Sequence, residues 1–129
     1  MIFSQLHKKE SGREDLEYER KRYEELCRYM DSGKAICRVL IANQMLCGYV
    51  WFFRRKDGRI HINEFAVEES QRGKGFGKIL IKEVYEYAKK AECMEVELFV
   101  MDNNEEAIKF YEKQGFKTER KWMMKTLEG

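Results

Sequence analysis

A cluster of glycine and basic residues, Gln71-Arg72-Gly73-Lys74-Gly75-Phe76-Gly77, has the composition of a phosphate-binding turn. Three of the nine glycines in the chain fall within five residues here, between an apolar stretch typical of a strand (60–67) and a stretch typical of a helix (76–91). The first amides of a helix have no partner inside the helix, and the helix dipole favours an anion at that end. The segment therefore predicts a loop whose backbone binds phosphate. The alternative is an ordinary flexible turn rich in glycine and lysine.

Two better-known phosphate motifs are absent. No Gly-Lys-Ser or Gly-Lys-Thr follows the cluster, and no acidic residue ends the next strand in the way a dinucleotide-binding fingerprint requires. The loop taken alone thus predicts a bound phosphate without naming the ligand.

A second segment further along the chain narrows the choice of ligand. It reads Asn104-Glu105-Glu106-Ala107-Ile108-Lys109-Phe110-Tyr111-Glu112-Lys113-Gln114-Gly115-Phe116. Together with Arg72–Gly77 it resembles the two signature motifs of the GNAT superfamily of N-acetyltransferases, and the resemblance covers roughly residues 35–126. It implies an enzyme that transfers an acetyl group from acetyl-CoA to a primary amine by direct attack in a ternary complex. The alternatives are a non-catalytic acyl-CoA-binding sensor or scaffold, and a protein-interaction domain.

The resemblance implies a place for each part of acetyl-CoA, which acts as a co-substrate. The backbone of Phe65, Ala66 and Val67 pairs with the pantetheine arm, and an amide of Ala66 or Val67 meets the oxyanion of the reaction. Asn104 either binds this arm or caps its own helix. The pyrophosphate is held by the amides of Arg72, Gly73, Lys74, Gly75, Phe76, Gly77 and Lys78.

Tyr111 is the proton donor that the resemblance implies for the departing thiolate. On a helix it shares a face with Asn104 and Ile108, which lie seven and three residues earlier. A phenol has a pKa about 1.5 units above that of a thiol, so donation costs only about 2 kcal/mol before the site adjusts anything. The alternative is that Tyr111 packs against its neighbours or hydrogen-bonds the sulfur.

Glu64 is the candidate base that removes a proton from the amine. It stands in an otherwise apolar strand segment, where a carboxylate is costly unless it is paired or useful. The alternative is a salt bridge to a lysine or a place on the rim of the cleft. Strict strand alternation puts His61 and Asn63 on the opposite face, which favours a structural role for His61.

The elements that position these residues predict an α/β (α+β) fold. Its mixed, mostly antiparallel sheet has about six strands, flanked by helices on both faces. A capping box at Ser11 begins a first helix, and strands follow at 35–41, 47–53 and 59–67. The strand at 94–100 runs parallel to that of 59–67 after a helical crossover, and the resemblance implies that this pair splays apart. Strands at 117–120 and 122–127 close the sheet. The aromatic residues Tyr49, Trp51, Phe52 and Phe53 form core or line an acceptor pocket.

Composition limits the class of protein. The 129 residues predict a single domain (1–129), and a net charge of +2 gives no general attraction to nucleic acid or an anionic membrane. Four cysteines without CxxC spacing and only two histidines favour no metal site. No apolar run approaches the roughly 20 residues of a membrane span. We therefore expect a cytoplasmic protein, a monomer or homodimer, whose partners are acetyl-CoA and an amine acceptor.

Overall fold

A computed structural model describes residues 28 and 34–128 of the chain. These residues divide into two compact units, one ending at Phe99 and the other beginning at Val100. Each unit is described by itself. The helix expected after Ser11 lies outside the described residues.

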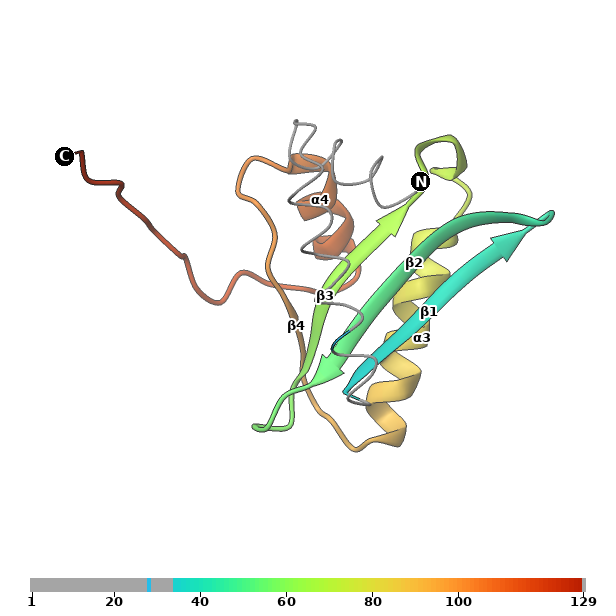
Figure 1. The fold of residues 1–129 in the computed structure, drawn as a ribbon, viewed down its shortest axis with the longest axis horizontal. Coiled ribbons are helices and arrows are strands. Elements are labelled where there is room, and N and C mark those ends of the chain that lie inside the picture. The colour runs from blue at the N-terminus through green and yellow to red at the C-terminus, as the bar shows by residue number, and fades with distance from the viewer. Residues whose placement is uncertain (1–27, 29–33, 129) are drawn as a thin grey trace. The chain divides into compact units, whose positions relative to one another are not determined.

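The first unit is built on a four-stranded sheet with the order β1-β2-β3-β4 (Figure 1). β1 (Ala35–Ala42), β2 (Met45–Arg54) and β3 (Ile60–Val67) are antiparallel neighbours, and β4 (Val96–Leu98) is parallel to β3. The mixed sheet and the parallel pair confirm the predicted fold class. The β3–β4 ladder pairs only three positions, and it ends at Ile62 while β3 continues to Val67.

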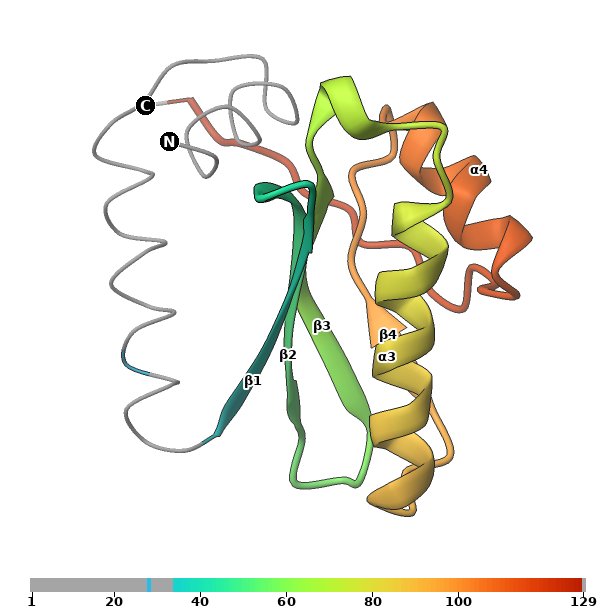
Figure 2. The ribbon, with the colours of Figure 1, turned by 90° about the vertical axis from the view of Figure 1, so that its right-hand side faces the viewer.

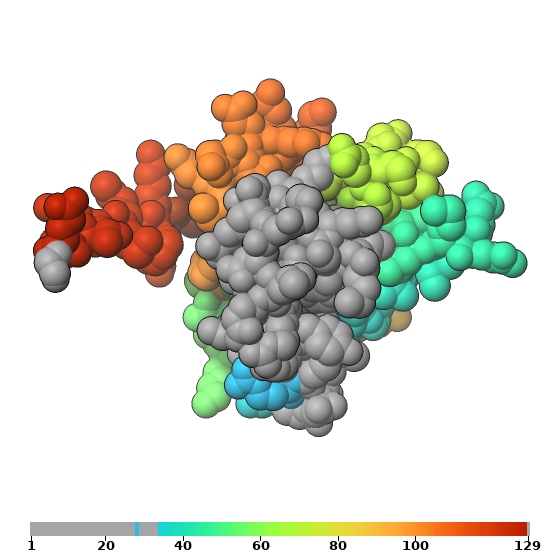
Figure 3. Space-filling view, turned by 45° about the horizontal axis from the view of Figure 1, so that its top comes forward, coloured from blue at the N-terminus to red at the C-terminus, as the bar shows by residue number. Residues whose placement is uncertain are grey.

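Short turns connect the antiparallel strands. Asn43 and Gln44 join β1 to β2 with φ angles of 51° and 63°, and Gly58 supplies a φ of 90° between β2 and β3. Asparagine and glycine tolerate this left-handed region, which suits the right-handed twist of a hairpin. The tip of the β1–β2 hairpin stands at the right-hand edge of the surface in blue-green (Figure 3).

Two β-bulges interrupt the antiparallel ladders. On β2, Cys47 is the extra residue, since Leu40 pairs with Gly48 and Ile41 with Leu46. On β3 the extra residue is Asn63, because Trp51 pairs with Glu64 whereas Phe52 pairs with Ile62. A bulge changes the face on which the following residues lie. The one at Asn63 decides the orientation of Glu64.

Helix α3 (Phe76–Lys90) packs on one face of the sheet (Figure 2). Its buried side chains recur at helical spacing and meet apolar residues of β2 and β3, and the ring of Phe52 contacts that of Tyr87 edge to face at 5.3 Å. The fully or nearly fully buried members of this layer are Val50, Phe52, Ile60, Ile62, Leu80, Ile81, Val84 and Ala88.

The opposite face of the sheet carries a second buried cluster. Tyr49, Trp51 and Ala66 form its centre, and Ala35, Cys37 and Phe53 pack against them. The aromatic run of β2 thus divides between two layers, with Phe52 toward α3 and its neighbours on the other side. Free cysteines occupy this unit as small apolar residues, with Cys47 and Cys93 buried and Cys37 half-buried.

The second unit contains α4 (Glu105–Lys113) and an extended C-terminal stretch. The closing strand pair predicted at 117–120 and 122–127 is wrong, because described residues 116–128 form neither strand nor helix. Residues 117–120 include no apolar side chain, and Trp122, Met123 and Met124 are consecutive and exposed. A strand needs alternating apolar residues to bury one face. The described sheet consequently has four strands where about six were expected.

Candidate active site

The glycine loop has the open backbone that its sequence predicts. It connects a short 3-10 helix, η1 (Glu69–Gln71), to the start of α3. Gly73 and Gly75 have φ angles of 80° and 82°, a conformation that costs other residues about 1–2 kcal/mol. Gly75 is the N-cap of α3 and provides no side-chain hydrogen bond to the first amides of the helix. These amides therefore retain their capacity to bind an anion.

Basic side chains brace this loop. Arg72 donates from Nε to the carbonyl of Val67 at 3.1 Å, which ties the loop to the last residue of β3. Lys74 donates from Nζ to Oε1 of Gln71 at 3.0 Å. The two cations thus hold the turn in shape in addition to placing positive charge beside it.

The end of β3 lies close to β2 at a glycine. A Cβ atom added at Gly48 would lie 2.7 Å from the carbonyl oxygen of Ala66 and 3.0 Å from Cδ1 of Leu80. Only glycine fits there without a shift of the backbone. This close approach fixes Ala66 and Val67, two of the three residues predicted to pair with the pantetheine arm, against the rest of the sheet.

Glu64 is a buried carboxylate on the face opposite α3. Glu64 is 8% exposed, and its Oε2 accepts a hydrogen bond from the hydroxyl group of Tyr49 at 2.7 Å. Burial of a carboxylate is costly unless it is paired or hydrogen-bonded, and this bond offsets part of the cost. The finding excludes a solvent-facing position on a rim.

Tyr49 is a site residue that sequence reasoning missed, since the aromatic run of β2 was assigned only to core or to an acceptor pocket. A buried tyrosine hydroxyl requires a polar partner, and Glu64 is the only carboxylate within β3. The need of a buried tyrosine hydroxyl for a polar partner was therefore the feature of the sequence that could have identified Tyr49. The strand register needed to pair the two residues was not visible in the sequence.

The predicted orientation of His61 is wrong. Because Asn63 is the extra residue of a bulge, His61 pairs with Phe53 and Glu64 pairs with Trp51, and these two β2 residues share one face. His61 therefore lies on the same face as Glu64. Its buried ring contacts that of Phe53 at 5.3 Å and that of Phe99 at 5.0 Å.

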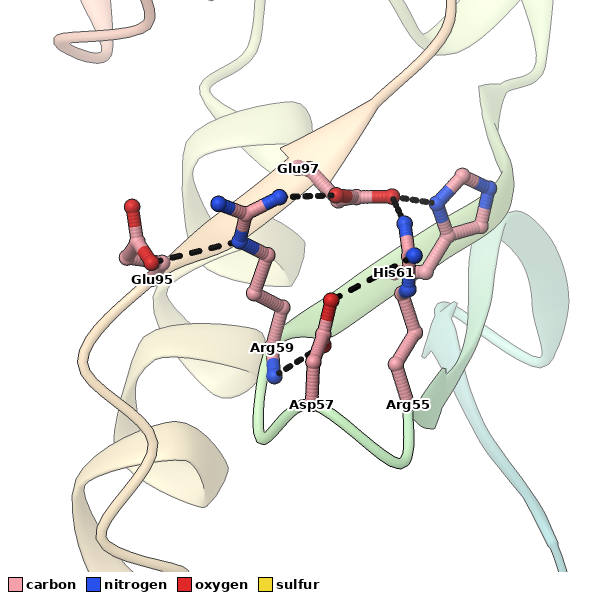
Figure 4. A network of polar contacts seen from close by, with 6 residues as sticks. All are labelled: Arg55, Asp57, Arg59, His61, Glu95 and Glu97. Atoms are coloured by element: carbon pink, nitrogen blue, oxygen red, sulfur yellow. Dashed lines mark hydrogen bonds and ion pairs between the residues drawn. The ribbon is translucent and has the colours of Figure 1, made fainter.

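A network of charged side chains surrounds His61 at the start of β3 and β4 (Figure 4). Glu97 accepts hydrogen bonds from Nδ1 of His61 and, at 2.9 Å, from Nη1 of Arg55. Arg59 lies 3.6 Å from the other oxygen of Glu97 and donates to Glu95 at 3.2 Å. These contacts join the parallel strands and give His61 the structural role that the sequence favoured.

The network makes stability depend on pH through Glu97. Burial raises the pKa of this carboxyl group, but the hydrogen bonds from His61 and Arg55 and their charges outweigh it and hold the pKa below its ordinary value of 4.5. A carboxyl group with a depressed folded-state pKa stabilises the protein above its unfolded-state pKa, and this stability is lost as the pH falls through the folded-state pKa. We expect Glu97→Gln to flatten the acid dependence of the unfolding free energy.

Urea denaturation between pH 6 and pH 3, followed by tryptophan fluorescence, measures this effect. Glu83→Gln on α3 is the control, because Glu83 is exposed and its ion pair with Arg38 spans 3.8 Å. Equal slopes for Glu97→Gln and the parent protein would contradict the assignment.

In the second unit, Asn104 lies at the start of α4. Asn104 is the N-cap of this helix, and its Oδ1 accepts from the amide of Ala107 at 3.2 Å. The capping role expected for Asn104 is thus present. Tyr111 is half-buried, and its ring contacts those of Phe110 at 5.5 Å and Phe116 at 5.7 Å.

Two other kinds of site are absent from residues 28 and 34–128. No group of three or more histidine, cysteine, aspartate or glutamate residues there is arranged to hold a metal ion. No helix in this part of the chain is long and apolar enough to cross a membrane.

Comparison with solved structures supports the fold. An acetyltransferase from Bacillus subtilis, solved in complex with CoA, is 26% identical and superposes with a TM-score of 0.67 over 75% of this chain and 62% of that one. The PaiA N-acetyltransferase of Thermoplasma acidophilum, also solved with coenzyme A, has a TM-score of 0.75 over 92% of this chain and 80% of that one, at 22% identity. The latter likeness concerns the fold alone.

Among curated relatives, the L-ornithine N5-acetyltransferase NATA1 of Arabidopsis thaliana is 35% identical over 91 residues, which are 66% of this chain and 40% of that protein. The chain spans about two-fifths of the length of the first curated relatives it matches. The family model described as "Acetyltransferase (GNAT) family" matches residues 3–116. This match includes the glycine loop, Glu64 and Tyr111, and with it the resemblance seen in the two motifs is confirmed: the chain belongs to the GNAT family of acetyltransferases.

Proposed function

We propose that this protein is an N-acetyltransferase that moves an acetyl group from acetyl-CoA to a primary amine by direct attack in a ternary complex. The observation that carries the proposal is the course of β3. This strand bears a buried carboxylate, Glu64, and leads through Val67 toward the glycine loop at the start of α3. The N-cap of that helix, Gly75, has no side chain to occupy its first amides. The CoA bound to the B. subtilis structure and the amine substrate named for the Arabidopsis relative support it.

In this proposal, different residues bind acetyl-CoA, accept a proton, stabilise the oxyanion and donate a proton. The amides of residues 72–78 bind the pyrophosphate of acetyl-CoA, and the backbone of Phe65–Val67 pairs with its pantetheine arm. Glu64 takes a proton from the ammonium form of the acceptor, and the neutral amine then attacks the thioester carbonyl carbon. An amide of Ala66 or Val67 stabilises the resulting oxyanion. As the carbon–sulfur bond breaks, Tyr111 gives its phenolic proton to the thiolate. The nitrogen, which carries an extra proton after the attack, gives that proton to the tyrosinate, and Glu64 releases its own proton to solvent.

Acetyl-CoA binding and free-thiol release together test this proposal. Isothermal titration calorimetry with acetyl-CoA is expected to give a Kd in the range from about 1 μM to 1 mM that is usual for enzyme substrates. A panel of L-ornithine, spermidine, a streptothricin-type antibiotic and a lysine-containing peptide then identifies the amine that releases CoA. Binding without thiol release for any amine would favour the sensor or scaffold, and no binding near 1 mM would contradict both.

The role of Tyr111 predicts a moderate loss of rate. Tyr111→Phe removes the proton donor but keeps the ring that contacts Phe110 and Phe116. Because a thiolate with a pKa near 8.5 leaves readily even unprotonated, we expect kcat to fall about tenfold with the Kd for acetyl-CoA unchanged. Stopped-flow thiol detection measures kcat. Tyr85→Phe on α3 is the matched control, and an unchanged kcat in Tyr111→Phe would remove the proton-donor role.

A further inference from the structure

The buried carboxylate of Glu64 accepts a hydrogen bond from Tyr49. We propose that Tyr49 is a positioning residue for Glu64, whose hydroxyl group fixes the carboxylate in one orientation and stabilises its ionised, proton-accepting form. The inference rests on the proposed function, in which Glu64 is the base. It adds a residue on β2 that lies outside both sequence motifs.

The geometry of the sheet brings the two side chains together. Tyr49 pairs with Ala66 across the β2–β3 ladder, so Glu64 is its diagonal neighbour on the same face. A diagonal neighbour lies about 7–8 Å away between Cα atoms, a distance that an aromatic side chain can span. The hydroxyl oxygen of Tyr49 reaches Oε2 of Glu64 at 2.7 Å, and the residues are 5% and 8% exposed.

The chemistry of this bond favours the charged carboxylate. A hydroxyl group that donates to an ionised acceptor forms a short charge-assisted bond, and a low local dielectric strengthens it. Glutamate loses rotamer freedom when it is held, so the bond also prepares the base in one geometry before substrate binds. Tyr49 belongs to a buried cluster with Trp51 and Ala66, the residues that pair with Glu64 and Tyr49 across the ladder.

Other titratable groups on this face must be included in the test. Cys37 comes from β1 and His61 from β3, and Glu97 on β4 is hydrogen-bonded to His61. Burial raises the pKa of the Cys37 thiol, the charge of Arg38 lowers it, and the charge of Glu64 raises it. Cys37 therefore senses the charge on Glu64, and its titration offers an internal check.

A carbon-13 NMR titration of the protein, labelled at glutamate side-chain carboxyl carbons, tests the inference without any acceptor. Glu64→Gln assigns the Glu64 resonance by its disappearance. We expect Tyr49→Phe to raise the pKa of Glu64 by about one unit, since a hydrogen bond to a charged group contributes about that much. Tyr87→Phe, which makes the same chemical change in the layer beneath α3, is expected to leave the pKa of Glu64 unchanged.

The pH profile of acetyl transfer gives a second readout, measured with the panel amine that turns over. Tyr49→Phe should lower kcat/KM about tenfold on the acidic limb and leave the plateau at higher pH near the parental value. A merely structural role would lower kcat/KM by the same factor at every pH. In the Glu64→Gln background, Tyr49→Phe should have no further pH-dependent effect.

The outcomes separate the two proposals. An unchanged pKa of Glu64 in Tyr49→Phe, or a loss of kcat/KM that is the same at every pH, overturns the role of Tyr49. Glu64 stays the base in that case if Glu64→Gln lowers kcat/KM by about 100-fold or more. Full turnover by Glu64→Gln overturns the base assignment and the role of Tyr49 with it. A raised pKa together with a shifted acidic limb supports both.

Discussion

Replacing Gly75 with valine should weaken acetyl-CoA binding by about 100-fold or more. Gly75 has a φ of 82° and precedes the first amides of α3, so a β-branched residue forces the turn into another conformation and covers the amides. Loss of two hydrogen bonds to a charged pyrophosphate, each contributing about 1.5–3 kcal/mol, exceeds the 2.7 kcal/mol that corresponds to 100-fold. Isothermal titration calorimetry measures the change directly.

Gly58→Val is the matched control for this variant. Gly58 has a φ of 90° in the β2–β3 turn, and among described atoms nothing lies within 4 Å of an added Cβ at either glycine. Both substitutions therefore impose similar backbone strain, and urea denaturation should show similar losses of stability. Equal affinities for acetyl-CoA in the two variants would show that the glycine loop does not bind the pyrophosphate.

Glu64→Gln is expected to lower kcat/KM by about 100-fold to 10,000-fold at neutral pH. The amide keeps the shape of the side chain and an oxygen that accepts the hydrogen bond of Tyr49, but it cannot take a proton from the acceptor amine. The affinity for acetyl-CoA should change less than twofold, because the predicted cradle is formed by other residues. The acidic limb of the pH profile should disappear with the base that causes it.

Glu97→Gln provides the comparison for that variant. It makes the same change at another partly buried glutamate of the sheet, whose partners are His61 and Arg55. We expect it to retain the parental kcat/KM while it alters acid stability. Thiol release at the parental rate from Glu64→Gln would mean that a different group, or water alone, removes the proton.

Elements that depend on local sequence were predictable here. Asn43-Gln44 and Asp57-Gly58 specify turns, in which Asn43, Gln44 and Gly58 adopt positive φ, and the apolar spacing of 76–91 specifies the helix that begins at Phe76. The failed prediction of strands at 117–127 has a physical cause. Strand propensity depends on a partner and a buried face, and neither can be read from a short charged segment.

The candidate site was predictable in its residue types and less so in its geometry. Gly73 and Gly75 predicted an open turn, and the position of Glu64 within an apolar strand identified it as a candidate base. The hydrogen bond from Tyr49 and the orientation of His61 depend on the register between β2 and β3. Register is set by long-range packing, so local periodicity could not supply it.

The additional residue in β3 makes strand length a constraint on chemistry. If the ladder closed without this bulge, Asn63 would pair with Trp51, and Glu64 would pair with Val50 and face the aliphatic layer under α3. Substitutions along this strand alter single contacts, whereas pairing Asn63 into the ladder would reverse the face of every β3 residue that follows it. Redesign of β3 on this scaffold must therefore preserve the bulge as well as the side chains.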